Sequence, residues 1–334
     1  MLWLLLMSLQ VFSAMAATTT AVCVAATAVG LWLVRKFRER QWGYCRSRRT
    51  LEGRVCIVTG ANGGIGFEVA KDLARRKARV ILACRNLNNA RKAVEDIRRE
   101  GILTGELIPM QLDLSSLESI REFSKEALEQ FKEIHLLVNN AGVYVPVAEK
   151  QKTADGFELH FGVNHLGHFL LTNLLIERIV TSKPSRIVTV SSTLHEKGEI
   201  DFNNLQLEDL SNLDPKKSRT NPGYCNSKLA NALFSQELAQ RVPEGVSTYA
   251  VCPGFTLTNL FRSFNPKFYH YIMFAPIMYW YMRSATQGAQ GVIACAVSED
   301  FEGQSGLFYK DCKLYKSKAD LNPEIAKKLW EKRT

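Results

Sequence analysis

Two patterns of apolar residues divide the chain near residue 50. Residues 1–34 contain no charged side chain. Because about 20 apolar residues are enough to cross the core of a bilayer, Val11 to Val34 predicts a membrane-spanning helix. From Leu51 onward, short apolar runs alternate with segments of helical periodicity, which is typical of a βαβ chain with a parallel sheet.

The second pattern predicts a single α/β domain of the Rossmann type, with a doubly wound parallel sheet. The expected strands are Arg54–Thr59, Arg79–Cys84, Leu107–Leu112, His135–Asn139, Arg186–Val190 and Ser247–Cys252. Helices are expected to begin near Gly64, Asn88, Leu117, Ala154 and Pro222. No repeat or linker separates a second domain. The expected organisation is a membrane anchor over residues 1–34, a basic juxtamembrane segment over 35–50 and the Rossmann domain over 51–334.

The distribution of charge along the chain predicts how the anchor is oriented in the membrane. The chain carries a net charge of +10, a balance that fits nucleic acid, an anionic membrane surface or a phosphate-rich ligand. Residues 1–50 hold seven basic side chains and one acidic one, so they carry +6 and leave +4 for residues 51–334. Basic residues beside a span favour the cytoplasmic side. We therefore expect a single-pass anchor, a domain facing the cytosol and no nucleic-acid partner.

A cleaved signal peptide is the alternative for the N-terminal segment. Ala14 to Ala16 resembles a cleavage site. A signal peptide, however, begins with basic residues before its apolar stretch, and this chain has none there.

The eight cysteines form no C-x-x-C pair and no regular spacing with the histidines, which predicts no zinc or other metal site. Cysteines within the expected strands indicate a reducing compartment.

A glycine-rich loop follows the first expected strand. Residues Thr59 to Gly66 read T-G-A-N-G-G-I-G and lead into a helix. Such glycines let the backbone turn sharply and bring helix N-terminal N–H groups to a pyrophosphate. The spacing fits both G-x-x-G-x-x-G and T-G-x-x-x-G-x-G, and a tight strand-to-helix turn without a ligand is the structural alternative. The candidate cofactor-binding residues are Gly60, Asn62, Gly64, Ile65 and Gly66.

The ends of the second and third strands bear on which dinucleotide is bound. NAD sites place an acidic residue after the second strand, whereas an arginine accommodates the 2′-phosphate of NADP. Here Cys84 stands in the acidic position and Arg85 follows, which favours NADP(H) over a solvated arginine at a helix cap. Asp113, at the end of the third strand, is a candidate for the adenine amino group or for a helix cap.

Tyr224 and Lys228 are four residues apart on a helix that begins at Asn221-Pro222, so they share one face. A neighbouring ammonium group, together with an oxidised nicotinamide, favours the phenolate. Bringing a tyrosine from a pKa of about 10 to near neutral requires roughly 4 kcal/mol. We expect this pair to exchange a proton near neutral pH.

Five ordered motifs give the chain a family resemblance. The glycine-rich loop, Asn139-Asn140-Ala141-Gly142, Asn164, Ser191-Ser192 and Tyr224-x-x-x-Lys228 follow one another in this order. Over about residues 50–310 the chain resembles the short-chain dehydrogenase/reductase family, whose T-G-x-x-x-G-x-G spacing selects Gly60, Gly64 and Gly66.

The resemblance implies roles for these residues. Tyr224 gives a proton to a carbonyl oxygen, Ser192 hydrogen-bonds the same oxygen, and Lys228 holds the nicotinamide ribose and lowers the pKa of Tyr224. Asn164 kinks its helix and holds a water in a proton relay toward Lys228. The remaining implied cofactor contacts are Asn140, Ala141, Gly142, Pro253, Gly254 and Thr258. Ser191 is the second choice for the role of Ser192 and is expected to be structural.

The 32-residue interval from Ser192 to Tyr224 is long for the family and is a candidate lid. With Ala83-Cys84-Arg85, the N-H-L-G-H-F sequence at Asn164 and the anchor, it resembles the microsomal retinol dehydrogenases that reduce retinal with NADPH. This resemblance implies a lipophilic aldehyde or alcohol as substrate. It also implies location in the endoplasmic reticulum membrane, with other organelle membranes as alternatives.

Three histidines and one aromatic stretch near the expected site have predicted roles in binding or packing. His195 is a candidate substrate contact. The aromatic stretch at residues 268–282 is expected to form an apolar wall that dips into the membrane, with ordinary packing as the alternative. His165 and His168 lack a third metal ligand, so a packed, hydrogen-bonded role is expected for both.

Two alternatives to a retinal reductase remain at this stage. A ketosteroid or lipid-derived aldehyde fits the same chemistry, because apolar pockets discriminate weakly among long hydrophobic molecules. An NADPH-binding membrane scaffold without turnover is the alternative from another class, although the complete set of site residues argues against it. The sequence leaves the oligomeric state open, and a homo-oligomer is compatible with it.

Overall fold

The computed structural model describes residues 2–146, 149–208, 220–256 and 279–332. The chain divides into two compact units, Met1–Gly43 and Tyr44–Thr334. The first unit contains helix α1, Leu2–Gln41. Within it, Thr18–Gln41 is long and apolar enough to cross a membrane, by length and composition.

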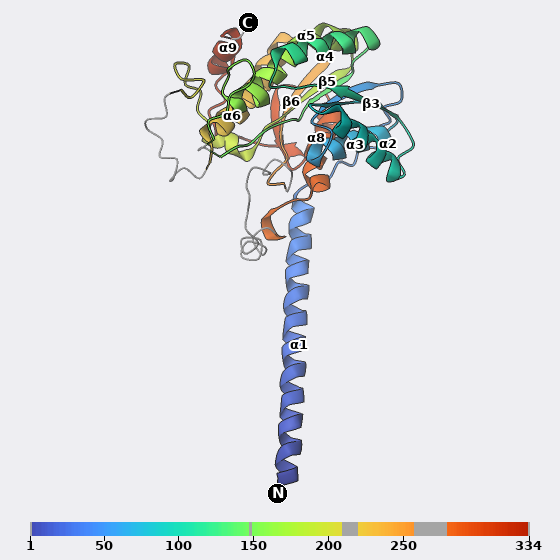
Figure 1. The fold of residues 1–334 in the computed structure, drawn as a ribbon, viewed down its shortest axis with the longest axis vertical. Helices are drawn as coiled ribbons and strands as arrows, with labels where there is room; N and C mark the ends of the chain where they lie inside the picture. Colours follow the sequence, from blue (N-terminus) through green and yellow to red (C-terminus); the bar gives the residue numbers. More distant parts are fainter. Residues whose placement is uncertain (1, 147–148, 209–219, 257–278, 333–334) are drawn as a thin grey trace. The chain divides into compact units, whose positions relative to one another are not determined.

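The second unit is built on an eight-stranded sheet, shown in Figure 1. Its strands are β1 (Val55–Thr59), β2 (Arg79–Cys84), β3 (Glu106–Gln111), β4 (Leu136–Asn139), β5 (Ser185–Val190), β6 (Val246–Cys252), β7 (Leu307–Lys310) and β8 (Lys313–Leu314). Their order is β3-β2-β1-β4-β5-β6-β7-β8, and all neighbours are parallel except β7 and β8. The order reverses between β2-β1 and β4, so the predicted doubly wound Rossmann sheet is confirmed.

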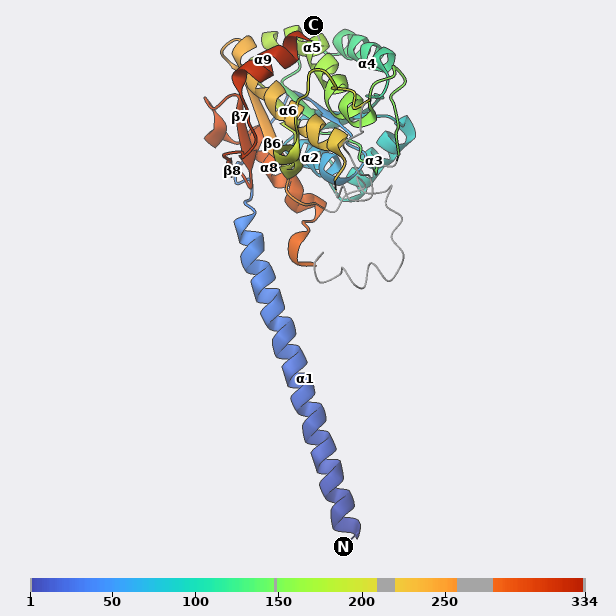
Figure 2. The same ribbon diagram turned by 90° about the vertical axis from the view of Figure 1, so that its left-hand side faces the viewer.

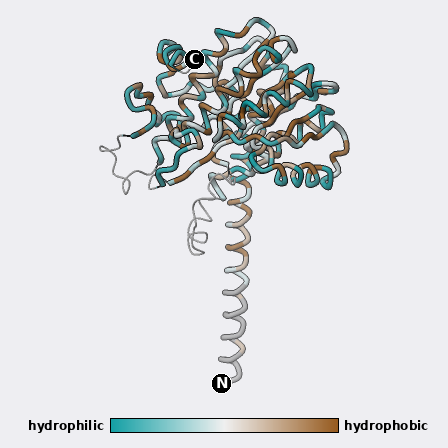
Figure 3. Tube along the Cα trace, turned by 45° about the horizontal axis from the view of Figure 1, so that its top comes forward, coloured by the Kyte–Doolittle hydropathy of each residue, from teal (hydrophilic) through white to brown (hydrophobic). Residues whose placement is uncertain are grey.

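The helices cover both faces of this sheet (Figure 2). One face carries α2 (Gly64–Arg75), α3 (Leu87–Arg99) and α8 (Ala285–Val297), whose buried side chains form one apolar cluster with the strands. The other face carries α4 (Leu117–Gln130), α5 (Gly167–Thr181) and α6 (Pro222–Arg241). Helix α9, Pro323–Glu331, packs on α6. Figure 3 shows hydrophobic residues gathered toward the centre of the second unit and hydrophilic residues more often along its outside.

Local sequence signals explain where several helices begin. The side chains of Asn86, Ser116 and Asn221 accept hydrogen bonds from the first turns of α3, α4 and α6. Pro222 stands in the first turn of α6, where its missing N–H costs nothing. Side-chain caps satisfy N–H groups that have no partner within the helix. The predicted start of α6 at Pro222 is therefore confirmed.

The helix expected near Ala154 begins later, so that prediction is wrong. Residues 151–159 form a turn instead, in which the N–H of Thr153 donates to the carbonyl of Phe157. Lys152 and Glu158 form a short antiparallel bridge around it. Gly156, at φ 85°, takes the left-handed conformation that closes the turn. The helical segment then starts at Leu159, passes through the π-helix η1, Phe161–Leu166, and continues as α5.

Residues 44–50 belong to the second unit, although the sequence predicts them in the juxtamembrane segment. The N–H of Cys45 donates to Gln290 Oε1 over 3.2 Å. The guanidinium of Arg76 donates to the carbonyls of Ser47 and Arg49, each over 3.0 Å. The compact unit therefore begins seven residues before Leu51.

Candidate active site

The expected site residues gather where the parallel strands end. Thr59, Cys84, Asn139, Val190 and Cys252 close β1, β2, β4, β5 and β6. In parallel pairing these carboxyl ends lie at one edge of the sheet, where open α/β sheets bind their ligands. The loops that follow them carry most of the motifs identified in the sequence.

The glycine-rich loop depends on its glycines for conformation and for space. Gly60 and Gly64 have positive φ angles of 66° and 54°. A Cβ atom on Gly66 would lie 2.4 Å from the carbonyl oxygen of Gly60 and 2.5 Å from Asn140 Nδ2. Helix α2 starts after Gly63 without a side-chain cap, so its first N–H groups are available to an anion. This cradle fits the pyrophosphate of a dinucleotide.

The side chain of Cys84, at the end of β2, contacts the glycine-rich loop. Its sulfur accepts hydrogen bonds from the backbone N–H groups of Ala61 and Asn62, while burial raises the pKa of the thiol to about 11. The position therefore carries no negative charge at neutral pH. Arg85 is exposed and forms no ion pair within the described part of the chain.

Asp113 shapes the turn that leads into α4. Its Oδ1 accepts hydrogen bonds from the N–H of Ser115, over 2.9 Å, and from the hydroxyl of Ser115, over 2.6 Å. Ser116, rather than Asp113, caps the helix. Only one carboxylate oxygen is engaged in these bonds, so a contact between the other oxygen and an adenine amino group remains a prediction.

The turn after β4 is tied to the end of β1. The hydroxyl oxygen of Thr59 accepts the N–H groups of Asn140 and Ala141, each over 2.9 Å, and Asn140 Nδ2 donates to the carbonyl of Thr59 over 2.8 Å. A Cβ on Gly142 would lie 3.3 Å from Asn164 Oδ1 and 3.6 Å from Lys228 Nζ. The structure thus brings this turn, the glycine-rich loop and the catalytic candidates together.

Tyr224 and Lys228 lie on the buried face of α6, as their spacing predicts. The side chain of Tyr224 is hydrogen-bonded to Ser192, and Lys228 Nζ lies 5.6 Å from the centre of the tyrosine ring. Lys228 Nζ donates to the carbonyl of Val190 over 3.1 Å. An ammonium group has three N–H donors, and Val190 is its one acceptor among the described residues. The remaining donors of this buried group fit the hydroxyls of a cofactor ribose.

Burial controls the ionisation of this pair. Desolvation raises the pKa of Tyr224 above its ordinary value, although the hydrogen bond with Ser192 opposes the rise. Desolvation also lowers the pKa of Lys228 to about 8. The lowered tyrosine pKa expected from the sequence is therefore not a property of the chain alone, because loss of hydration outweighs the nearby ammonium. At neutral pH the phenol is protonated and is poised to donate a proton.

Asn164 lies in the π-helix η1 and fastens two elements. Its side chain accepts the N–H of Val143 over 2.8 Å and donates to the carbonyl of Val143 and the hydroxyl of Ser227. Its backbone carbonyl accepts from His168 Nδ1 at 3.0 Å and from Asn231 Nδ2 at 3.1 Å. These two side chains are thus the donors to the carbonyl of Asn164 among the described residues. The relay itself remains a prediction.

The remaining predicted residues around the site fall into distinct positions. Ser191 is buried and its hydroxyl donates to the carbonyl of Lys228 over 2.7 Å, which agrees with a structural role. His195 is fully buried, stacks on Phe308, and has both ring nitrogens hydrogen-bonded, to Ser192 O and Ser317 Oγ. This environment favours packing over a substrate contact for His195.

The backbone of the segment after β6 contacts Arg283, which forms an ion pair with Asp311. Gly254 has a φ of 77°, and a Cβ there would lie 2.6 Å from the guanidinium carbon of Arg283. Arg283 donates to the carbonyl of Pro253 over 3.3 Å and pairs with Asp311 at 2.5 Å. The backbone of Pro253 and Gly254 is thereby fixed at the sheet edge. Thr258 and the aromatic stretch up to residue 278 lie outside the described residues.

The interval between Ser192 and Tyr224 is partly described. Its first half includes the 3-10 helix η2, Thr193–Lys197, and the apolar side chains of Ile200, Phe202 and Leu205 pack against a cluster of α6 and α9 residues. This half is therefore part of the body of the domain. Residues 209–219 of the expected lid are outside the described part.

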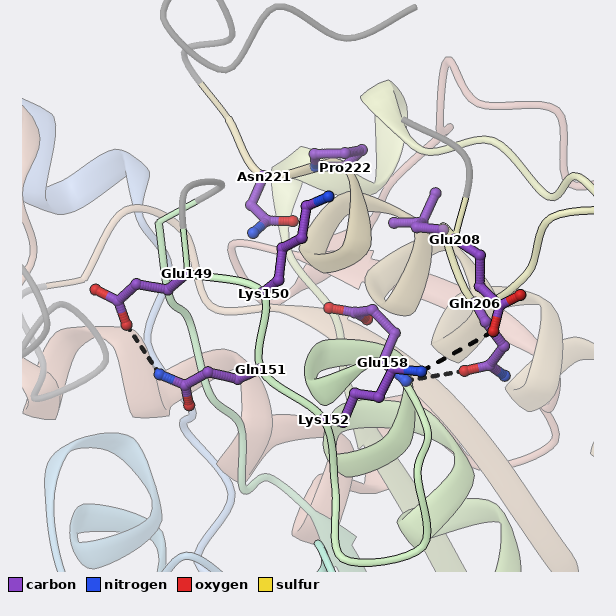
Figure 4. Close-up of a pocket in the computed structure, with 10 residues that line it drawn as sticks. Glu149, Lys150, Gln151, Lys152, Glu158, Gln206, Glu208, Asn221 and Pro222 are labelled. Carbon is purple, nitrogen blue, oxygen red and sulfur yellow. Dashed lines mark hydrogen bonds and ion pairs between the residues drawn. The ribbon is translucent and has the colours of Figure 1, made fainter. Parts of the chain in front are cut away.

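A cavity of about 320 Å³ opens at the N-terminal end of α6 (Figure 4). It is lined by Glu149, Lys150, Gln151, Lys152, Glu158, Gln206, Leu207, Glu208, Asn221 and Pro222. None of the four catalytic candidates lines it. Its lining combines carboxylates, ammonium groups and amides with the apolar surface of Leu207 and Pro222.

Sequence reasoning missed a layer of aromatic side chains beside Tyr224. Tyr144 packs edge-on against the Tyr224 ring with 5.1 Å between centroids, and the His160 ring lies 6.1 Å away. His160 is fully buried, with Nδ1 2.6 Å from Glu158 Oε1 and Nε2 accepting the N–H of Val145. Tyr144 directly follows the N-N-A-G-V segment, and this position next to a site motif could have indicated that Tyr144 lies near the site.

Proteins similar in sequence to this chain identify its family. The family model described as short chain dehydrogenase matches residues 54–204. Human retinol dehydrogenase 12 is 43% identical over 299 residues, covering 89% of this chain and 90% of that protein. Human retinol dehydrogenase 14 is 40% identical over 343 residues, covering 95% of this chain and 97% of that protein.

Solved structures agree on the fold. Salutaridine reductase from Papaver somniferum superposes with a TM-score of 0.58 at 24% identity, covering 77% of this chain and 99% of that one. The Pseudomonas aeruginosa RhlG/NADP active-site complex gives a TM-score of 0.60 at 21% identity, covering 78% and 94%. The extent of the similarity to the retinol dehydrogenases shows that this chain is an oxidoreductase that belongs to the short-chain dehydrogenase/reductase family, which uses NAD(P).

Proposed function

We propose that this protein is a membrane-anchored, NADP(H)-dependent oxidoreductase that interconverts a lipophilic aldehyde and its alcohol, with retinal and retinol as the substrate pair. The observation that carries the proposal is the buried Tyr224 hydroxyl, hydrogen-bonded to Ser192 and flanked by the ammonium of Lys228. This arrangement meets the needs of carbonyl reduction, in which the oxygen of the substrate must receive a proton.

When bound, the reduced nicotinamide supplies a hydride to the carbonyl carbon. Tyr224 donates its proton to the carbonyl oxygen, and the Ser192 hydroxyl hydrogen-bonds the same oxygen and stabilises its developing charge. Lys228 orients the cofactor ribose and, as a cation, stabilises the phenolate that Tyr224 leaves behind. Since burial keeps Tyr224 protonated, the resting site is prepared for reduction. Asn164 holds the turn at Val143 and the face of α6 that carries Lys228.

The preference for NADP(H) rests on Arg85 and Cys84. Arg85 is exposed at the end of β2, and the neutral Cys84 thiol provides no carboxylate for a ribose 2′-hydroxyl. A carboxylate there would repel the 2′-phosphate, whereas the guanidinium of Arg85 attracts it and donates hydrogen bonds to it.

The choice of a retinoid draws on the relatives, which are named retinol dehydrogenases. A ketosteroid or a lipid-derived aldehyde would undergo the same chemistry. The anchor is consistent with all three, because each is a hydrophobic molecule that partitions into membranes.

The proposed topology places the predicted span, Val11–Val34, across the membrane and the catalytic unit in the cytosol, at the endoplasmic reticulum. The basic side chains at residues 35–49 support this orientation by the positive-inside rule. Protease protection in intact microsomes tests it. The catalytic unit should be digested without detergent, and its protection would place it in the lumen.

Turnover is tested by following NADPH consumption by the full chain in detergent with all-trans-retinal, a 3-ketosteroid or nonanal. Retinal should be consumed fastest, with retinol as the product, and Tyr224→Phe is the matched control for consumption that does not involve the site. Preferred turnover of the steroid or nonanal would replace the retinoid as substrate. Tight NADPH binding without turnover of any of the three would favour the scaffold and refute the proposed reaction.

A further inference from the structure

A buried histidine, His168, lies between the cofactor-binding turn and the catalytic side chains. It stands one turn after Asn164, at the start of α5, with 1% of its surface exposed. Its Nε2 lies 2.9 Å from Thr59 Oγ1, and its Nδ1 lies 3.0 Å from the carbonyl oxygen of Asn164. The two contacts connect strand β1 with the π-helix η1, which are 105 residues apart at Thr59 and Asn164.

The chemistry of the partners fixes the direction of both hydrogen bonds. The carbonyl of Asn164 only accepts, so Nδ1 of His168 must carry a hydrogen. Burial lowers the pKa of His168 to about 4, with the charge of Lys228 acting in the same direction, so the ring is neutral and its Nε2 is an acceptor. Thr59 therefore donates its hydroxyl hydrogen to Nε2.

The same hydroxyl oxygen is the acceptor for the turn after β4. Thr59 Oγ1 receives the N–H groups of Asn140 and Ala141, which use the oxygen lone pairs and leave its hydrogen for His168. The carbonyl of Val138 is a more distant alternative for that hydrogen, at 3.3 Å against 2.9 Å. The turn that faces the cofactor is thus bonded through one hydroxyl to His168.

The Nδ1 side of His168 is connected to Lys228 through further hydrogen bonds. The carbonyl of Asn164 is shared with Asn231 Nδ2, which also donates to the carbonyl of Val190 over 3.2 Å. Val190 is the acceptor for Lys228 Nζ. An unbroken series of side-chain hydrogen bonds therefore runs from the turn at Asn140 to the ammonium of Lys228. Hydrogen-bonded partners behind a reacting group orient it and tune its basicity.

We propose that His168 is a positioning residue that couples the cofactor-binding turn to Asn164 and Lys228, holding both in the geometry needed for hydride and proton transfer. This inference rests on the proposed function, because it assigns His168 to the same reaction. A histidine that serves packing alone would contribute to stability and leave the chemical step unchanged.

The test compares three substitutions of His168 with a control at the opposite end of the same strands. His168→Phe removes both hydrogen bonds and keeps an aromatic ring. His168→Asn retains a donor near the Nδ1 position, whereas His168→Gln retains a polar group near Nε2. His135→Phe is the matched control, because His135 is also buried and its Nδ1 accepts the N–H of Val55 at the start of β1, away from the site.

We expect His168→Phe to lower kcat roughly tenfold or more and to move the pH profile of kcat, with a smaller effect on KM for the aldehyde. His168→Asn should recover part of kcat, since it preserves the bond to Asn164. His135→Phe should lower Tm and leave kcat and the pH profile unchanged. A His168→Phe enzyme with a wild-type kcat and pH profile and a lowered Tm would overturn the proposal.

A second measurement needs neither a substrate nor a stable variant. Nitrogen-15 NMR of histidine-labelled full chain in detergent should show His168 as the neutral Nδ1–H tautomer, unchanged between pH 5.5 and 8.5. An Nε2–H tautomer, or titration near pH 6.5, would overturn the proposal. Failure of the wild-type protein to turn over any aldehyde would instead refute the proposed function, so the two failures are distinguishable.

Discussion

Replacing Lys228 by methionine is expected to make the protein more stable and inactive at the same time. Lys228 is 3% exposed, and its ammonium has one hydrogen-bond acceptor, the carbonyl of Val190, among the described residues. Burial lowers its pKa from the ordinary 10.5 to about 8. Because a tenfold change in proton affinity corresponds to about 1.4 kcal/mol, holding the charged form at pH 7 costs about 3 kcal/mol.

Methionine has a similar length and no charge, so it removes this cost. Val190 keeps Asn231 as a donor, and no buried carbonyl loses its last partner. We expect Lys228→Met to raise the free energy of unfolding by about 2–3 kcal/mol at pH 7, or roughly 4–10 °C in Tm, and to abolish turnover. Thermal unfolding in detergent micelles without added cofactor measures the change.

The sign of the pH dependence is part of the prediction. Between pH 8 and 10.5 the lysine of the unfolded chain is protonated while the buried one is neutral, so the stability of the wild type rises with pH. Lys228→Met lacks this contribution, and the gap between the two proteins should close as pH rises from 7 to 9.5. Lys125→Met, at an exposed position of α4, is the control and should change stability by less than about 0.5 kcal/mol. A Lys228→Met protein that is less stable at pH 7, or a gap independent of pH, would refute the reasoning.

Three further predictions concern the proposed chemistry and cofactor. Tyr224→Phe should lower retinal reduction at least about 100-fold and leave NADPH affinity unchanged; activity above a few per cent of wild type would remove Tyr224 from the acid role. Arg85→Asp should shift the ratio of kcat/KM from NADPH toward NADH, and an unchanged ratio would locate 2′-phosphate recognition elsewhere. Gly66→Ala should weaken NADPH binding and lower Tm, since its Cβ would lie 2.4 Å from the carbonyl of Gly60; wild-type cofactor affinity, measured by fluorescence titration, would contradict this.

The strands predicted from the sequence lie within one residue of those observed, because buried parallel strands are continuous apolar runs bounded by turns. Strands β7 and β8 and helices α8 and α9 were not predicted. Strand β7 has four residues and pairs with β6 more than 50 residues earlier in the chain, so its place depends on tertiary contacts. Short apolar runs of this kind do not reveal their partners.

The site was predictable where its residues are close in sequence. Tyr224 and Lys228 share a face by their spacing of four, and the same spacing relates Asn164 to His168. What the spacing could not show is that His168 reaches Thr59, because that contact joins residues 109 positions apart. The ion pair between Arg283 and Asp311 behind Gly254 escaped prediction for the same reason.

The ionisation of Tyr224 was the point on which sequence reasoning was least complete. The proximity of Lys228 indicated a lowered pKa, but the cost of burying the phenolate depends on how thoroughly the surrounding side chains exclude water. Tyr144 and His160 pack around the ring and contribute to that exclusion. No pattern of residue types in the sequence measures this desolvation.

The π-helix η1 stands at the start of the helical segment that continues as α5, and its wider turn sets the rotational phase between Asn164 and the residues of α5. Each residue of an α-helix turns the following side chains by about 100°, so one residue more or fewer rotates everything beyond it. Deleting a single residue from Phe161–Leu166 would therefore leave α5 packed on α4 only if Asn164 turned away from Val143. The extra residue of the π-helix therefore allows Asn164 to keep its hydrogen bond with Val143 while the apolar side chains of α5 keep their place in the core.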